Sequence, residues 1–203
     1  MSGTLRAVRG IALLLICILA GYYVGTAFWK SPPIAPDNPS PAGSALAETL
    51  PEFALPGLDG DLRSISEWSG RSMLINFWAT WCAPCRREMP LLQTVHDERS
   101  DTPFSVIGIA VDRMPDVQAY IGETGVTYPI LVGQQDAMDA AELFGPAFVG
   151  LPFTIFVGRN GQVLGLESGE IHLDELQRIL AVMDDFDAGR ISATQARAAL
   201  AAD

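Results

Sequence analysis

The chain has 203 residues, of which 49% are hydrophobic and 18% are charged, which is too apolar for a disordered chain and enough for one domain with its own core. The net charge of −11 argues against a nucleic-acid partner, because phosphate backbones are bound by basic surfaces. Three cysteines are too few for a small scaffold held together by disulfides.

The N-terminal thirty residues differ in charge from the rest of the chain. They contain Arg6, Arg9 and Lys30 and no acidic residue, so removing their charge of +3 leaves −14 on the remainder. Residues 10–29 carry no charge and would span about 30 Å as a helix, the thickness of a bilayer's hydrocarbon core. The charge and hydropathy of residues 1–30 therefore predict a short cytoplasmic N-terminus followed by one membrane-spanning helix.

This apolar segment is interpreted as an uncleaved anchor, with a processed signal peptide as the alternative. The small residues that would suit a signal peptidase come only at the end of a span already long enough to cross. Under either interpretation the rest of the chain lies outside the cytoplasm. The sequence thus predicts a single-pass protein of a bacterial inner membrane, with its domain on the periplasmic side.

A proline-rich segment separates the apolar segment from the folded part. Residues 31–47 contain five prolines and would reach roughly 50 Å as a semi-extended linker, at about 3.1 Å per residue. The folded domain is expected over residues 48–185, with a C-terminal helical tail over residues 186–203. Whether this tail docks on the domain is not decided by its composition.

Strands and helices are expected to alternate along the domain. The strands at 72–78 and 104–111 are almost continuously apolar, as expected for strands covered on both faces. This alternation predicts an α/β fold, with a mixed central sheet flanked by helices and a terminal hairpin. In chain order, we expect strands at 53–55, 62–65 and 72–78, a helix at 82–99, a strand at 104–111, a helix at 115–123, a strand at 129–132, a helix at 136–144, a hairpin at 153–157 and 162–167, and helices at 173–183 and 191–202.

Redox chemistry is indicated by the motif Trp81-Cys82-Ala83-Pro84-Cys85. The cysteines follow a buried strand and begin a helix, with Pro84 in its first turn, where a missing N–H costs little. The unpaired N–H groups and the positive end of the helix dipole favour a thiolate at Cys82, and a thiolate is the species that attacks a disulfide. We expect Cys82 to attack a client disulfide and Cys85 to resolve the mixed disulfide.

Two other uses of the cysteine pair remain open, a structural disulfide and a metal site. Zinc would need two more ligands, and His96 and His172 do not lie at the usual spacing. No metal and no cofactor is therefore predicted.

The segment MLINFWATWCAPCRREMP resembles the active-site segment of the thioredoxin superfamily, and within it that of the membrane-anchored TlpA/ResA-like thiol–disulfide oxidoreductases. The resemblance extends over about residues 48–182 and implies a thioredoxin-like fold with a four-stranded sheet. It implies that Cys82 is the attacking cysteine and Cys85 the resolving one. It also implies that Pro90 kinks the helix and that Pro152 is a cis-proline facing the dithiol.

A cis bond before Pro152 would turn the backbone N–H and C=O of Leu151 outward, where an extended client segment could pair with them. Together with Trp81, Ala83 and Pro84, these residues form the client-binding surface that we expect.

The sequence departs from cytoplasmic thioredoxin at one buried position. Asn76 stands where an acid is expected on the strand, and an amide cannot accept the proton of Cys85. Asn at this place is similar to the TlpA/ResA subgroup. Glu88 is the candidate acceptor instead, and water is the alternative.

The resemblance implies an extracytoplasmic disulfide reductase rather than an oxidant, acting on apocytochrome c or on other exported clients. Its partners would be disulfide-containing proteins and a membrane or periplasmic electron donor. A peroxiredoxin-like peroxidase is an alternative, because residues 53–68 (FALPGLDGDLRSISEW) resemble the N-terminal part of that family. A non-catalytic copper-binding chaperone is a second alternative.

Overall fold

The structure is a computed structural model that describes residues 46–145 and 150–201. The apolar segment at residues 10–29 and most of the proline-rich linker lie outside the described residues. Within the described ranges, no helix combines the length and the apolar character that crossing a bilayer requires.

The predicted alternation of strands and helices is confirmed, with most boundaries within two residues of expectation. One element that was not predicted is a short 3₁₀ helix, η1 (Ile65–Trp68). The other elements are β1 (Ala54–Pro56), β2 (Leu62–Ser64), β3 (Ser72–Trp78), α2 (Ala83–Glu98), β4 (Phe104–Val111), α3 (Met114–Thr124), β5 (Ile130–Gly133), α4 (Gln135–Glu142), β6 (Phe153–Val157), β7 (Val163–Ser168), α5 (Leu173–Asp187) and α6 (Ala193–Leu200).

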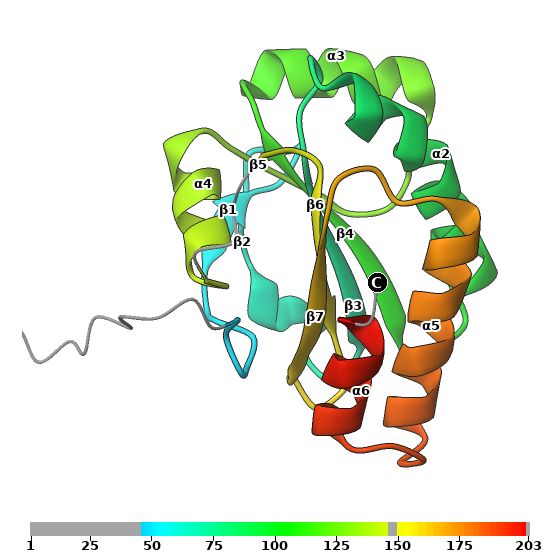
Figure 1. The fold of residues 1–203 in the computed structure, drawn as a ribbon. Helices are drawn as coiled ribbons and strands as arrows, with labels where there is room; N and C mark the ends of the chain where they lie inside the picture. Colours follow the sequence, from blue (N-terminus) through cyan, green and yellow to red (C-terminus); the bar gives the residue numbers. More distant parts are fainter. Residues whose placement is uncertain (1–45, 146–149, 202–203) are drawn as a thin grey trace, which may run out of the picture. The chain divides into compact units, whose positions relative to one another are not determined.

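The central sheet has the strand order β5-β4-β3-β6-β7, while β1 and β2 form a separate antiparallel pair (Figure 1). β3, β4 and β5 run parallel, and β6 and β7 are antiparallel to their neighbours. The sheet is therefore mixed, as predicted, but it has five strands instead of four. The extra strand is β5, which pairs with β4 from Gly108↔Ile130 to Val111↔Gly133.

Two apolar layers cover the sheet, with α2, α5 and α6 on one face and α4 on the other (Figure 1). Side chains of a strand alternate between faces, so Leu74 and Trp78 of β3 point toward α2, and Ile75 and Phe77 point toward α4. The same alternation directs Asn76 to the α2 face. This places a polar side chain in the apolar layer directly under α2.

The C-terminal helix α6 docks on the domain. Arg197 donates from Nε to the backbone O of Val163 at 2.9 Å and from Nη2 to the backbone O of Glu48 at 3.0 Å. Val163 also donates its N–H to the O of Glu48 at 3.0 Å. The edge at β7 is therefore covered by α6 and by the segment that leads into the domain.

Candidate active site

The two cysteines lie where the chain leaves β3 and enters α2. Cys82 is the N-cap residue of α2, and its Sγ accepts the backbone N–H of Cys85 at 3.3 Å. The two residues form a disulfide, with 5.3 Å between their Cα atoms. Pro84 occupies the first turn, where a backbone N–H has no helical partner in any case. The helix thus begins at the cysteine pair, as the sequence predicts.

The two cysteines differ in their access to solvent. Cys85 is fully buried, whereas Cys82 keeps 5% of its surface exposed. Trp81 is 69% exposed, which is unusual for a large aromatic side chain. Ala83 is exposed and Pro84 is half-buried. A molecule that approaches this end of α2 therefore meets Trp81 and Cys82 before it could reach Cys85.

The turn that precedes Cys82 is held by a carboxylate from the neighbouring strand. Oδ2 of Asp112 accepts the backbone N–H of Thr80 at 3.0 Å and its hydroxyl at 2.5 Å. Asp112 is not among the residues predicted from the sequence. The signal that would have indicated it is its position directly after a buried strand, because the carboxyl ends of parallel strands meet at one edge of a sheet.

The Leu151–Pro152 peptide bond is cis, as the resemblance implies. Phe153 pairs with Phe77 in the antiparallel register of β6 against β3, so the preceding residues lie opposite the end of β3. Pro152 is buried and Leu151 is partly buried. The cis bond is therefore brought to the edge of the sheet from which the cysteine loop departs.

Glu88 is a buried carboxyl on α2, with only 2% of its surface exposed. Its Oε1 accepts a side-chain N–H of Asn76 at 2.8 Å, and its Oε2 accepts the backbone N–H of Ile171 at 2.9 Å. Burial raises the pKa of Glu88 to about 7, although these two hydrogen bonds lower it. Glu88 lies one helical turn after Cys85, so a group able to take up or release a proton near neutral pH shares its face of α2.

Asn76 is fully buried and uses both amide hydrogens. It donates to Glu88 and, at 2.9 Å, to Oγ1 of Thr154 on β6. The residue on the strand therefore supports a carboxylate on the helix. The structure brings Asn76 and Glu88 together, which their separation in the sequence does not reveal.

Pro90, also predicted as a supporting residue, lies inside α2 on its exposed side. Its backbone O accepts the hydroxyl of Thr94 at 3.0 Å. Because proline has no N–H, the carbonyl of Arg86 lacks its usual helical partner. Pro90 is therefore separate from the buried hydrogen bonds around Glu88.

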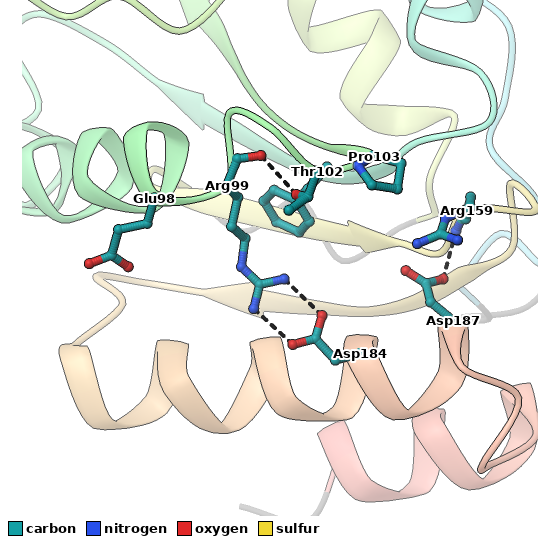
Figure 2. Close-up of a pocket in the computed structure, with 8 residues that line it drawn as sticks. Glu98, Arg99, Thr102, Pro103, Arg159, Asp184 and Asp187 are labelled. Carbon is teal, nitrogen blue, oxygen red and sulfur yellow. Dashed lines mark hydrogen bonds and ion pairs between the residues drawn. The ribbon is translucent and has the colours of Figure 1, made fainter.

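A polar hollow of about 540 Å³ lies at the other end of α2 (Figure 2). Arg99 binds Asp184 there through two hydrogen bonds of 2.8 and 2.9 Å, and Asp187 accepts the backbone N–H of Arg159 at 3.0 Å. At a rise of about 1.5 Å per residue, the hollow is about 24 Å from Cys82 along the helix. Its paired charges and its distance from the cysteines separate it from the candidate active site.

Comparison with known proteins gives a family match and relatives of similar length. The family model for Redoxin matches residues 45–180. The thiol-disulfide oxidoreductase ResA of Geobacillus kaustophilus is 29% identical over 177 residues, which cover 86% of this chain and 94% of the relative.

Two solved structures are similar in fold. A thiol:disulfide interchange protein of the thioredoxin family from Chlorobium tepidum has a TM-score of 0.57 and 27% identity, covering 72% of this chain and 95% of that chain. A DsbF homologue from Corynebacterium diphtheriae has a TM-score of 0.59 and 25% identity, covering 70% of this chain and 94% of that chain.

Proposed function

Because the chain belongs to the Redoxin family, we propose that it is a thiol–disulfide oxidoreductase of the thioredoxin superfamily that exchanges disulfides with client proteins through Cys82 and Cys85. The observation that carries this proposal is the cysteine pair itself. It is closed as a disulfide at the start of α2, and Cys82 is the more accessible partner.

In the proposed reaction, the reduced protein presents Cys82 as a thiolate. The helix N-terminus favours this form, and the backbone N–H of Cys85 already points at Sγ. The thiolate attacks one sulfur of the client disulfide, forms a mixed disulfide and displaces the other client sulfur as a thiolate.

Cys85 then completes the exchange. Its thiol loses a proton to the Glu88 carboxylate, directly or through a water, and the resulting thiolate attacks Sγ of Cys82. The second client sulfur leaves as a thiolate. The client gains two electrons and the protein is left with the Cys82–Cys85 disulfide, so a separate electron donor must reduce it before the next cycle. A pKa near 7 suits Glu88 to this role.

The surface proposed for client binding surrounds the accessible sulfur. It consists of Trp81, Ala83 and Pro84 beside Cys82, and of Leu151 and Pro152 in the segment that leads into β6. The exposed ring of Trp81 offers apolar area, and the backbone of Leu151 offers pairing to an extended client segment.

The direction of electron transfer and the cellular location of the protein are inferred from the resemblance to the TlpA/ResA-like proteins. We propose that the protein acts as a reductant in the extracytoplasmic space, anchored by residues 10–29 and tethered by residues 31–47. Clients would be exported proteins with disulfides, including apocytochrome c, and the electron donor would be a membrane or periplasmic protein.

The two-cysteine scheme is tested by turnover of insulin disulfides with dithiothreitol as the electron source. Cys82→Ser is expected to abolish turnover, and Cys85→Ser to accumulate a mixed disulfide that mass spectrometry detects. Multiple turnover by Cys85→Ser at the wild-type rate would contradict the scheme. The reduction potential of the Cys82–Cys85 couple, measured against glutathione, gives the direction of electron flow.

A further inference from the structure

The loop between β7 and α5 contacts both the cis-proline segment and α2 through residues 169–171, here called the strap. Gly169 donates its N–H to the backbone O of Pro152 at 2.9 Å. Two residues later, Ile171 donates its N–H to Oε2 of Glu88 at 2.9 Å. Gly169 has a φ of 113°, a value that side chains disfavour, so glycine permits the turn between these two bonds. The strap therefore joins the cis-proline segment to the buried carboxyl on α2.

The middle residue of the strap forms an ion pair with α2. Nε of Arg87 lies 3.1 Å from Oε1 and 3.0 Å from Oε2 of Glu170, and Nη2 of Arg87 also binds Oε2. Arg87 precedes Glu88 on the helix, and Glu170 precedes Ile171 on the strap. The ion pair at the surface and the hydrogen bond beneath it are thus neighbouring connections between the same two segments.

We propose that the Arg87–Glu170 pair is a positioning element that holds the Ile171 N–H on Glu88 and so lowers the pH at which Glu88 ionises. The hydrogen bond from Ile171 stabilises the charged carboxylate in a site with little water. With the ion pair gone, one buried hydrogen bond and the packing of the buried Ile171 side chain would hold this part of the strap to α2. The consequence for turnover rests on the role of Glu88 in the proposed function, but the positioning itself does not.

The other groups around Glu88 determine whether losing the ion pair raises or lowers the pKa of Glu88. The carboxylates of Glu170 on the strap and Glu175 on α5 raise the pKa of Glu88, whereas the hydrogen bonds from Ile171 and Asn76 lower it. Thr154 of β6 reaches Glu88 only through Asn76, and Tyr128, before β5, is a buried phenol. On α2, Cys85 is held in the disulfide.

Arg87→Gln is the informative substitution. It releases the strap and also leaves the charge of Glu170 unneutralised, and both changes raise the pKa of Glu88. Glu170→Gln also releases the strap, which raises the pKa of Glu88, but it removes a repulsive charge, which lowers that pKa. Its two effects on the pKa therefore oppose each other.

Arg86→Gln is the matched control. It removes the same charge from the preceding position of α2, and the side chain of Arg86 makes no hydrogen bond or ion pair with another described residue. A purely long-range charge effect would therefore appear in both variants.

The test uses the full chain in its disulfide form. The Glu88 carboxyl is titrated by ¹³C NMR and the amide of Ile171 is followed by hydrogen exchange. For Arg87→Gln, we expect the midpoint to rise by about half to one pH unit, the size of one hydrogen bond, and Ile171 to exchange about tenfold faster. Arg86→Gln should leave both unchanged. Exchanging the two residues, as Arg87→Glu with Glu170→Arg, should restore the protection of Ile171.

Equal midpoints in Arg87→Gln and Arg86→Gln, or unchanged exchange at Ile171, would overturn the positioning role. Both measurements are made without turnover, so a failure of the proposed oxidoreductase activity would not affect them. If the Glu88 midpoint moves in Arg87→Gln and the pH dependence of turnover does not, the positioning stands and the proposed role of Glu88 in proton transfer fails.

Discussion

Asn76 on β3 donates its amide to Glu88 on α2 at 2.8 Å, and both side chains are buried. An amide donor favours the ionised carboxyl, whereas burial opposes it more strongly, so the pKa of Glu88 lies near 7. The group that we propose as the acceptor of the Cys85 proton therefore comes from the helix that carries the cysteines, and the strand supplies its hydrogen-bond donor.

The raised pKa of Glu88 predicts a pH-dependent stability. The pKa of this carboxyl is ordinarily 4.5 and is about 7 in the fold. As pH rises, the unfolded chain therefore releases the Glu88 proton before the folded chain does. The stability present below pH 4.5 is consequently lost as pH rises toward 7, by on the order of 3 kcal/mol. In urea unfolding at pH 4.5 and 8, we expect this loss in the wild type and a smaller one in Glu88→Gln.

Glu123→Gln, on an exposed part of α3, is the control for removing one carboxyl and should follow the wild type. The same pH dependence in the wild type and in Glu88→Gln would contradict the assigned pKa.

Asn76→Asp is predicted to shift the acid limb of the pH profile, where activity falls as Glu88 becomes protonated, to higher pH. The substitution places a second carboxyl within hydrogen-bond distance of Glu88, and two buried carboxylates so close do not both ionise near neutral pH. We expect the limb in kcat/KM to rise by about one pH unit or more. Asn76→Ala, which removes the donor without adding charge, should shift it less. If Asn76→Asp keeps the wild-type profile, Glu88 is not the group that controls the acid limb.

Asp112→Ala should loosen the turn before Cys82. It leaves the N–H of Thr80 without its acceptor, which costs roughly 1–3 kcal/mol for a partly buried donor. We expect a lower denaturation midpoint and a several-fold lower kcat/KM, because Cys82 follows Thr80 by two residues. Asp139→Ala, whose carboxylate binds the exposed side chain of Gln135, is the control and should change neither. A wild-type kcat/KM in Asp112→Ala would show that the turn does not need this carboxylate.

Local sequence patterns were sufficient for the central strands and for the position of the cysteines. The runs at β3, β4 and β6 are apolar enough to define each strand to the residue, and Pro84 marks the first turn of α2. The number of strands in the sheet was wrong for a different reason. A strand was predicted at residues 129–132, close to the observed β5, but the resemblance implied a sheet of four strands. The pairing of β5 with β4 is a long-range choice that periodicity does not encode.

The contacts that complete the candidate site are also long-range. Glu88 was only one of two candidates from the sequence, because one of its two hydrogen-bond donors is Ile171, 83 residues away. The same holds for Asp112 and Thr80, which are 32 residues apart. Residues of this kind are brought together by the order of strands in the sheet, so no local motif marks them.

Two glycine substitutions, one where α6 docks on β7 and one on α3, are expected to change the free energy of unfolding in opposite directions. A Cβ at Gly165 of β7 would lie 3.1 Å from Cδ1 and 3.2 Å from Cβ of Leu200, so Gly165→Ala should push α6 away and cost roughly 1–3 kcal/mol. A Cβ at Gly122 of α3 meets nothing within 4 Å, so Gly122→Ala should stabilise by roughly 0.5–1 kcal/mol through its effect on the unfolded chain. Urea unfolding measures both, and proteolysis after Arg197 reports release of α6. Equal stabilisation by the two substitutions, with no new cleavage, would mean that α6 does not rest on β7.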